Sequence, residues 1–160
     1  MYPLLVFLHV LAVFGFLMAH GVTVGVYFAL HRERNVDRIR LLLQLSSKAV
    51  IIMDIALLLL LVCGIIAGFI GQWWGHVWIW LSLGLLIALL GAMELMGVRT
   101  FNGLRVGVGL ASSRGEKPLP EPMSAEELDA LLNRTQPLQL TAIGFSGLAV
   151  IAWLMIFKPF

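Results

Sequence analysis

Four long apolar runs constrain what this chain can fold into. They cover residues 3–30, 41–70, 73–98 and 138–157, and each reaches the roughly 20 residues that a helix needs to cross a bilayer. The composition agrees, since 60% of the 160 residues are hydrophobic and only 12% are charged. The sequence therefore predicts a single domain, residues 1–160, that is all-α and integral to a membrane. The expected architecture is an antiparallel four-transmembrane-helix bundle.

The basic residues predict how these helices are oriented. Nine of the 11 Lys and Arg lie in residues 32–40 and 99–134, whereas the turn at residues 71–76 has none. The positive-inside rule then places those two segments in the cytoplasm and both termini outside, in a multi-pass protein of the inner membrane. No charged region precedes the first run, so we expect it to stay in the mature protein. The orientation of the helices explains the positions of the Lys and Arg residues, so no nucleic-acid partner is expected.

Histidines follow one face of the first run. His9, His20 and His31 are each 11 residues apart, and 11 helical steps bring each to within about 20° of the one before. An ionisable side chain inside a span costs a few kcal/mol and needs a partner, a ligand or a cavity. Two interpretations stay open for each histidine. It either packs as a neutral ring bonded to a backbone carbonyl, or it binds a ligand.

Ionisable residues in the second and third runs predict a polar cluster inside the bundle. The second run carries Lys48 and Asp54, and the third carries Glu94. Estimated depths pair Lys48 with Glu94, and Asp54 with His20, in the half of the bundle near the cytoplasm. Paired charges of this kind either fix the register of the helices or form a proton or small-ion pathway.

Small residues recur at four-residue spacing in three of the runs, which favours close helix packing. The same ridges suit contact with a neighbouring subunit, so we expect other membrane subunits or a homo-oligomer as partners besides the lipid bilayer. The ridges consist of Gly21, Gly25 and Ala29; Gly64 and Gly68; and Gly84, Ala88 and Ala92.

The long cytoplasmic loop, residues 99–137, has the composition of a soluble segment. Its glycines allow only a weak continuation of the third helix, and Pro118, Pro120 and Pro122 favour an extended stretch. Ser124 and Glu127 have the spacing of a capping box. A short amphipathic helix is expected from there to about Asn133, lying on the cytoplasmic ends of the bundle.

The chemistry expected inside such a bundle is ligand binding rather than catalysis. The sequence has no phosphate-binding loop, no paired cysteines, no zinc-protease motif and no nucleophile elbow. Imidazole on a bundle helix is a common axial ligand of haem iron. His9 is the best candidate for this role, and His20 and His76 are weaker ones. Cys63 and Met155 are further candidates for a second ligand.

Short motifs give a resemblance to a known group. The start of the first helix, Leu8-His9-Val10-Leu11-Ala12, a histidine at its end, four spans and a Lys-Pro-Phe terminus resemble the bacterial haem-dependent protoporphyrinogen oxidases. The first motif is also similar to CopD-type copper-resistance proteins and to uncharacterised four-helix relatives. The resemblance implies b-type haem on His9, with His31 corresponding to the histidine that ends the helix. The oxidase group has a Lys and a His where this chain has Ser82 and Glu94, so oxidase activity is not implied.

Three functions are therefore compared with the structure below. The leading expectation is an inner-membrane protein that binds haem b through His9 in a redox-related role without independent catalysis. The alternative is an accessory subunit of a larger membrane complex, in which the histidines are structural. The third is a proton or small-ion pathway.

Overall fold

Four membrane-length helices form the protein. The structure is a computed structural model that describes residues 2–111, 123–133 and 137–159. Within these ranges every regular element is helical, and four helical segments are long and apolar enough to cross a membrane. The prediction of an all-α, four-helix membrane bundle is confirmed. The spanning helices are α1 (Tyr2–Arg32), α2 (Val36–Ile70), α3 (Val77–Met93) and α6 (Pro137–Phe157).

Short elements extend and connect these spans. The turn after α2 contains the 3-10 helix η1 (Trp73–Gly75), and α3 continues through the π-helical segment η2 (Glu94–Val98) into α4 (Arg99–Gly107). The continuous helical segment from α3 to α4 is thus longer than the helix that the apolar run at residues 73–98 predicted. The helix α5 (Ala125–Asn133) follows, and the three prolines of the loop lie outside the described residues.

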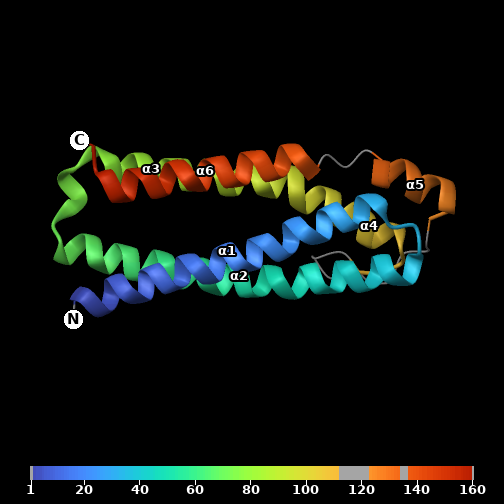
Figure 1. The fold of residues 1–160 in the computed structure, drawn as a ribbon, viewed down its shortest axis with the longest axis horizontal. Coiled ribbons are helices and arrows are strands. Elements are labelled where there is room, and N and C mark those ends of the chain that lie inside the picture. The colour runs from blue at the N-terminus through green and yellow to red at the C-terminus, as the bar shows by residue number, and fades with distance from the viewer. Residues whose placement is uncertain (1, 112–122, 134–136, 160) are drawn as a thin grey trace.

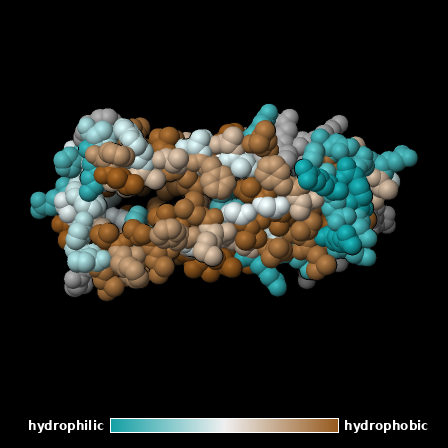
Figure 2. Space-filling view, in the orientation of Figure 1, coloured by the Kyte–Doolittle hydropathy of each residue, from teal (hydrophilic) through white to brown (hydrophobic). Residues whose placement is uncertain are grey.

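The spans are arranged as two pairs of helices. The helix α1 packs on α2, and α3 packs on α6. Both termini lie at one end of the bundle, which we call the terminal end, and α4 and α5 lie at the other, the loop end (Figure 1). Hydrophobic side chains cover most of the visible length, whereas hydrophilic ones gather at the two ends, most densely at the loop end (Figure 2). This distribution is that of a multi-pass membrane protein.

A hydrophobic core of buried side chains lies at the loop end. The helices α1 and α2 have 31 and 35 residues. At about 1.5 Å per residue they are longer than the roughly 30 Å of a bilayer core, so apolar side chains at their ends need cover from protein. The helices α4 and α5 supply it. The buried cluster consists of Val26, Leu30, Ile39, Leu43, Leu104, Val108, Leu128 and Leu132.

The predicted capping box at the start of α5 is confirmed. The Ser124 backbone N–H donates to Glu127 Oε2 at 3.0 Å, and the Glu127 N–H donates to Ser124 Oγ at 3.3 Å. These bonds satisfy two donors that the first turn of a helix leaves open. The described part of this helix, Ala125–Asn133, covers the range that the sequence predicts.

Aromatic rings join the elements at the terminal end. The Trp73 ring lies 6.0 Å from that of Tyr2 and 5.7 Å from that of Trp78, measured between centroids. The Lys158 ammonium lies 4.2 Å from the centroid of Trp73, a cation–π distance. A Cβ on Gly71 would come within 2.6 Å of the Trp73 ring, so only glycine allows this turn. Trp73 thereby links the ends of α1, α3 and α6.

Candidate functional site

His9 binds the backbone of the neighbouring helix through one ring nitrogen. Its Nδ1 lies 2.9 Å from the carbonyl oxygen of Leu60 in α2. A carbonyl only accepts, so this bond requires the hydrogen on Nδ1 and leaves Nε2 with a free lone pair in the neutral ring. A Cβ on Gly64 would lie 3.1 Å from Cε1 of His9, which is tighter than ordinary contact. Gly64 therefore lets the ring lie close against α2.

His20 lies against α6. A Cβ on Gly144 would come within 2.9 Å of His20 Nε2, and the Phe145 ring lies 5.6 Å from the His20 ring. His9 contacts α2 instead, so the two histidines of α1 have different neighbours. Figure 2 shows the surface hollowed between the two helix pairs in the half nearer the termini. His9, seven residues into α1, belongs to this half.

Aromatic side chains lie at both ends of this half of the bundle. Towards the bundle centre, Phe16 stacks on His20 with a centroid distance of 6.2 Å and an interplanar angle of 7°. Towards the termini lie Trp73 and its neighbours. His9 is about 10 Å from the start of α1 and about 16 Å from His20 along the helix axis. Along the bundle axis, apolar and aromatic side chains therefore lie on both sides of the level of His9, towards the centre and towards the termini.

His20 is buried, and one nitrogen of its ring has no hydrogen-bond partner among the described residues. The residue is 8% exposed, and its Nε2 has no partner within the described part of the chain. The hydroxyl of Thr23 donates to the backbone carbonyl of His20 rather than to the ring. The predicted pair of His20 with Asp54 is wrong, because His20 faces α6 whereas Asp54 is exposed on α2.

The predicted intramembrane polar cluster is not formed. Lys48, Asp54 and Glu94 are all exposed, and none of them makes an ion pair with any residue that the structure describes. The reason is the pairing of the helices. The face of α2 that could have met α3 is free, since α2 packs on α1 and α3 packs on α6. Lys48 and Glu94 are therefore not partners here.

Lys48 lies next to a polar contact between α2 and α4. The hydroxyl of its neighbour Ser47 accepts from Arg105 Nη1 at 2.5 Å, and Arg105 Nε donates to the carbonyl of Ala111. Asp54 is six residues further in, about 9 Å along the axis.

The remaining histidines have separate surroundings. His31 Nδ1 lies 3.3 Å from the carbonyl oxygen of Leu132, which ties α1 to α5. His76 is exposed at the start of α3 and does not cap that helix with its side chain. It lies at the terminal end, about 10 Å above the level of His9, so the structure does not bring them together. His20, about 16 Å from His9 on the same helix, is too far to share one iron with it.

Two residues of this site were not singled out as site residues from the sequence. Gly64 was noted only as part of a ridge of small residues, and Gly144 was not noted. Cys63 is buried beside Gly64 in α2, and Met155 is half-buried in α6. Across the described ranges, no three His, Cys, Asp or Glu side chains are grouped as for a metal ion.

Comparisons of the chain with protein-family models, with curated proteins and with solved structures returned no match. Haem binding, membership of a complex and the orientation in the membrane therefore stay predictions from the chain itself.

Proposed function

We propose that this protein binds a b-type haem through Nε2 of His9, in a redox-related role and without catalysis of its own. The observation that supports this most is the bond from His9 Nδ1 to the Leu60 carbonyl, at 2.9 Å. Histidines that bind metals almost always donate their other ring N–H in this way, which fixes the tautomer and the ring orientation. A purely structural histidine makes the same bond, and the absorption spectrum described below distinguishes the two roles.

The residues around His9 suit a large apolar ligand. Gly64 lets the imidazole lie close against α2. The rings of Phe16 and Trp73 limit this region on its two sides and reduce the access of water. When bound, the haem would supply one-electron chemistry. The loop end is proposed to lie in the cytoplasm of an inner-membrane protein, because the bases concentrate there.

The test is the absorption spectrum of gently solubilised full-length protein. We expect a Soret band that His9→Ala abolishes or strongly shifts, because loss of the axial imidazole leaves the iron weakly held. The matched control is His76→Ala, which removes an exposed histidine at the terminal end and should leave the spectrum unchanged. A spectrum that survives His9→Ala would reject His9 as the ligand.

A second candidate function, an accessory subunit of a membrane complex, has its own support. Asp54 and Glu94 are exposed well inside the spans without an ion-pair partner among the described residues, and charges at such places are costly in lipid. A Cβ on Gly21 or Gly25 would meet nothing within 4 Å, so this ridge of α1 is open to another helix. Copurification of a fixed partner, weakened by Asp54→Asn, would support this function. A monodisperse monomer after mild extraction would reject it.

A further inference from the structure

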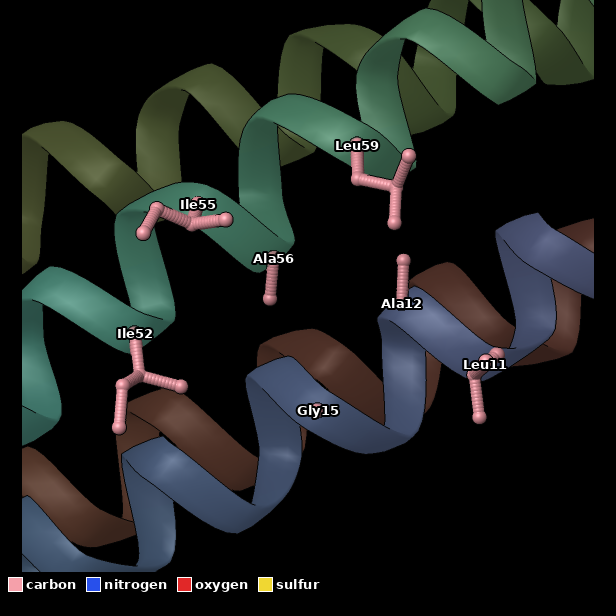
Figure 3. A pocket seen from close by; sticks show the side chains of 7 residues that line it. All are labelled: Leu11, Ala12, Gly15, Ile52, Ile55, Ala56 and Leu59. Atoms are coloured by element: carbon pink, nitrogen blue, oxygen red, sulfur yellow. The ribbon is translucent and has the colours of Figure 1, made fainter.

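An apolar groove runs between α1 and α2. Its volume is about 250 Å³, and its walls are the side chains of Leu11, Ala12, Gly15, Ile52, Ile55, Ala56 and Leu59 (Figure 3). The small residues Gly15 and Ala56 form its floor, where a Cβ on Gly15 would lie 3.6 Å from that of Ala56. In Figure 3, α3 and α6 lie behind the pair α1 and α2, so the groove opens away from them. In a membrane this opening faces lipid.

The α2 wall of the groove continues towards the loop end as far as Lys48. Ile52, Ile55 and Leu59 follow Lys48 by 4, 7 and 11 residues. These steps keep all four side chains within about 60° of one another on the helix, with Ile52 about 6 Å from Lys48 along the axis, towards the terminal end. Gln44, one turn below Lys48, is exposed on the same face. This face of α2 thus carries a cation and an amide on the loop-end side of the groove, beyond Ile52, and apolar side chains along the groove itself.

Three arginines of the loop end have acidic partners, whereas Lys48 has none among the described residues. Arg34, Arg38 and Arg40 lie near Asp129, Glu33 and Asp37, respectively, in ion pairs. Lys48 has no carboxylate within 4.0 Å in the described ranges, and Asp54 points about 120° away around α2. Arg105, at the same level, is also without a described carboxylate partner. The charge near the end of the groove is therefore positive and unneutralised.

We propose that this groove is a binding site for an anionic phospholipid. One acyl chain lies along Ile52, Ile55 and Leu59, and the phosphate of the headgroup lies on the Lys48 ammonium with Gln44 as a neighbouring donor. Lysine carries its charge at the end of a flexible apolar stem, which suits a phosphate at the membrane boundary. The proposal does not depend on haem. It concerns the outer face of α1 and α2 rather than the space beside His9.

The test compares lipid retention by the purified, delipidated full chain in native mass spectrometry. The probes are phosphatidylglycerol and phosphatidylcholine with identical acyl chains. Wild type should retain phosphatidylglycerol preferentially. Lys48→Gln should weaken phosphatidylglycerol binding about fivefold, the effect of one lysine near an anionic surface, and weaken the binding of zwitterionic phosphatidylcholine less. Lys48→Arg should restore the preference. Lys158→Gln is the matched control, because Lys158 lies on Trp73 at the terminal end.

Two further measurements test whether the acyl chain of the lipid lies in the groove. Gly15→Leu and Leu59→Phe place atoms in the groove and should weaken both lipids; Leu59 is 41% exposed, so its variant should fold even where that of Gly15 does not. Inorganic phosphate should not displace the lipid. Equal retention of the two lipids by wild type, an unchanged preference in Lys48→Gln, or displacement by phosphate alone would overturn the proposal.

Discussion

At the scale of single residues, Gly144 determines how closely α6 approaches α1. An added Cβ would lie 2.9 Å from His20 Nε2 and 3.1 Å from Cε of Met93. Both neighbours are themselves packed, so neither is free to move without cost.

The first prediction is that Gly144→Ala destabilises the protein by about 1–3 kcal/mol, the usual cost of overpacking. Thermal unfolding in detergent measures it. Gly84→Ala is the control, because a Cβ there would meet nothing within 4 Å, and its stability should be equal or slightly higher. His20→Ala should recover part of the loss when it is combined with Gly144→Ala. Strictly additive losses would contradict the contact between Gly144 and His20.

The second prediction concerns the hydrogen on His9. Its ring should be protonated at Nδ1 because of the bond to the Leu60 carbonyl, and nitrogen NMR of histidine-labelled protein reports the tautomer. Gly64→Ala should shift the Nδ1–H resonance, since the new methyl group crowds the ring at 3.1 Å. Gly21→Ala, on an open face of the same pair of helices, should leave this resonance unchanged. An Nε2-protonated ring in wild type would rule out the proposed ligand role as well.

The sequence predicted which helix carries the histidines but not their neighbours or the pairing of the charges. The 11-residue spacing depends only on the helix itself, whereas in the structure His9 contacts α2 and His20 contacts α6. Whether Asp54 or Glu94 points inwards depends on which helix packs beside α2 and α3. Four antiparallel helices can be paired in several ways, and hydropathy alone does not distinguish them. That is why the predicted cluster was wrong.

At the scale of elements, α5 is a short helix held by its cap, by Leu128 and Leu132, and by a half-exposed ion pair of Asp129 with Arg34. Its position was predictable from the capping box and the apolar spacing. The extension of α3 into α4 was not predictable, because the glycines and basic residues of this segment are typical of a loop.

The third prediction is that Ser124→Ala loosens α5 by about 1 kcal/mol, the typical cost of losing an N-cap. Hydrogen exchange of the α5 amides should accelerate, while exchange in α2 stays unchanged. Glu126→Gln is the control, because Glu126 is exposed in the same turn and is not the capping glutamate. Equal acceleration in both variants would show that the cap does not hold α5.

At the scale of the whole molecule, the two ends of the bundle differ in chemistry. The loop end carries the ion pairs, whereas the terminal end carries tryptophans and Lys158. The termini share one end, as four spans require.

The fourth prediction assigns these ends to the two sides of the membrane. In a Cys63→Ala background, a cysteine at Gly75 should react with an impermeant reagent added to intact cells, and one at Glu126 should react only after permeabilisation. Both positions are exposed, so access to the side chain does not limit either reaction. The reverse pattern would invert the orientation.

The π-helical segment η2 has a consequence for how the third span tolerates changes in length. A turn closed by i to i+5 bonds holds one residue more than an α-helical turn, so everything after residues 94–98 is out of phase with α3 by about 100°. Deleting a single residue from this segment would leave an ordinary helix, yet would rotate Arg105 away from the Ser47 hydroxyl that it now reaches. A one-residue deletion here should therefore be read as a rotation of the loop end rather than as a shortening of the span.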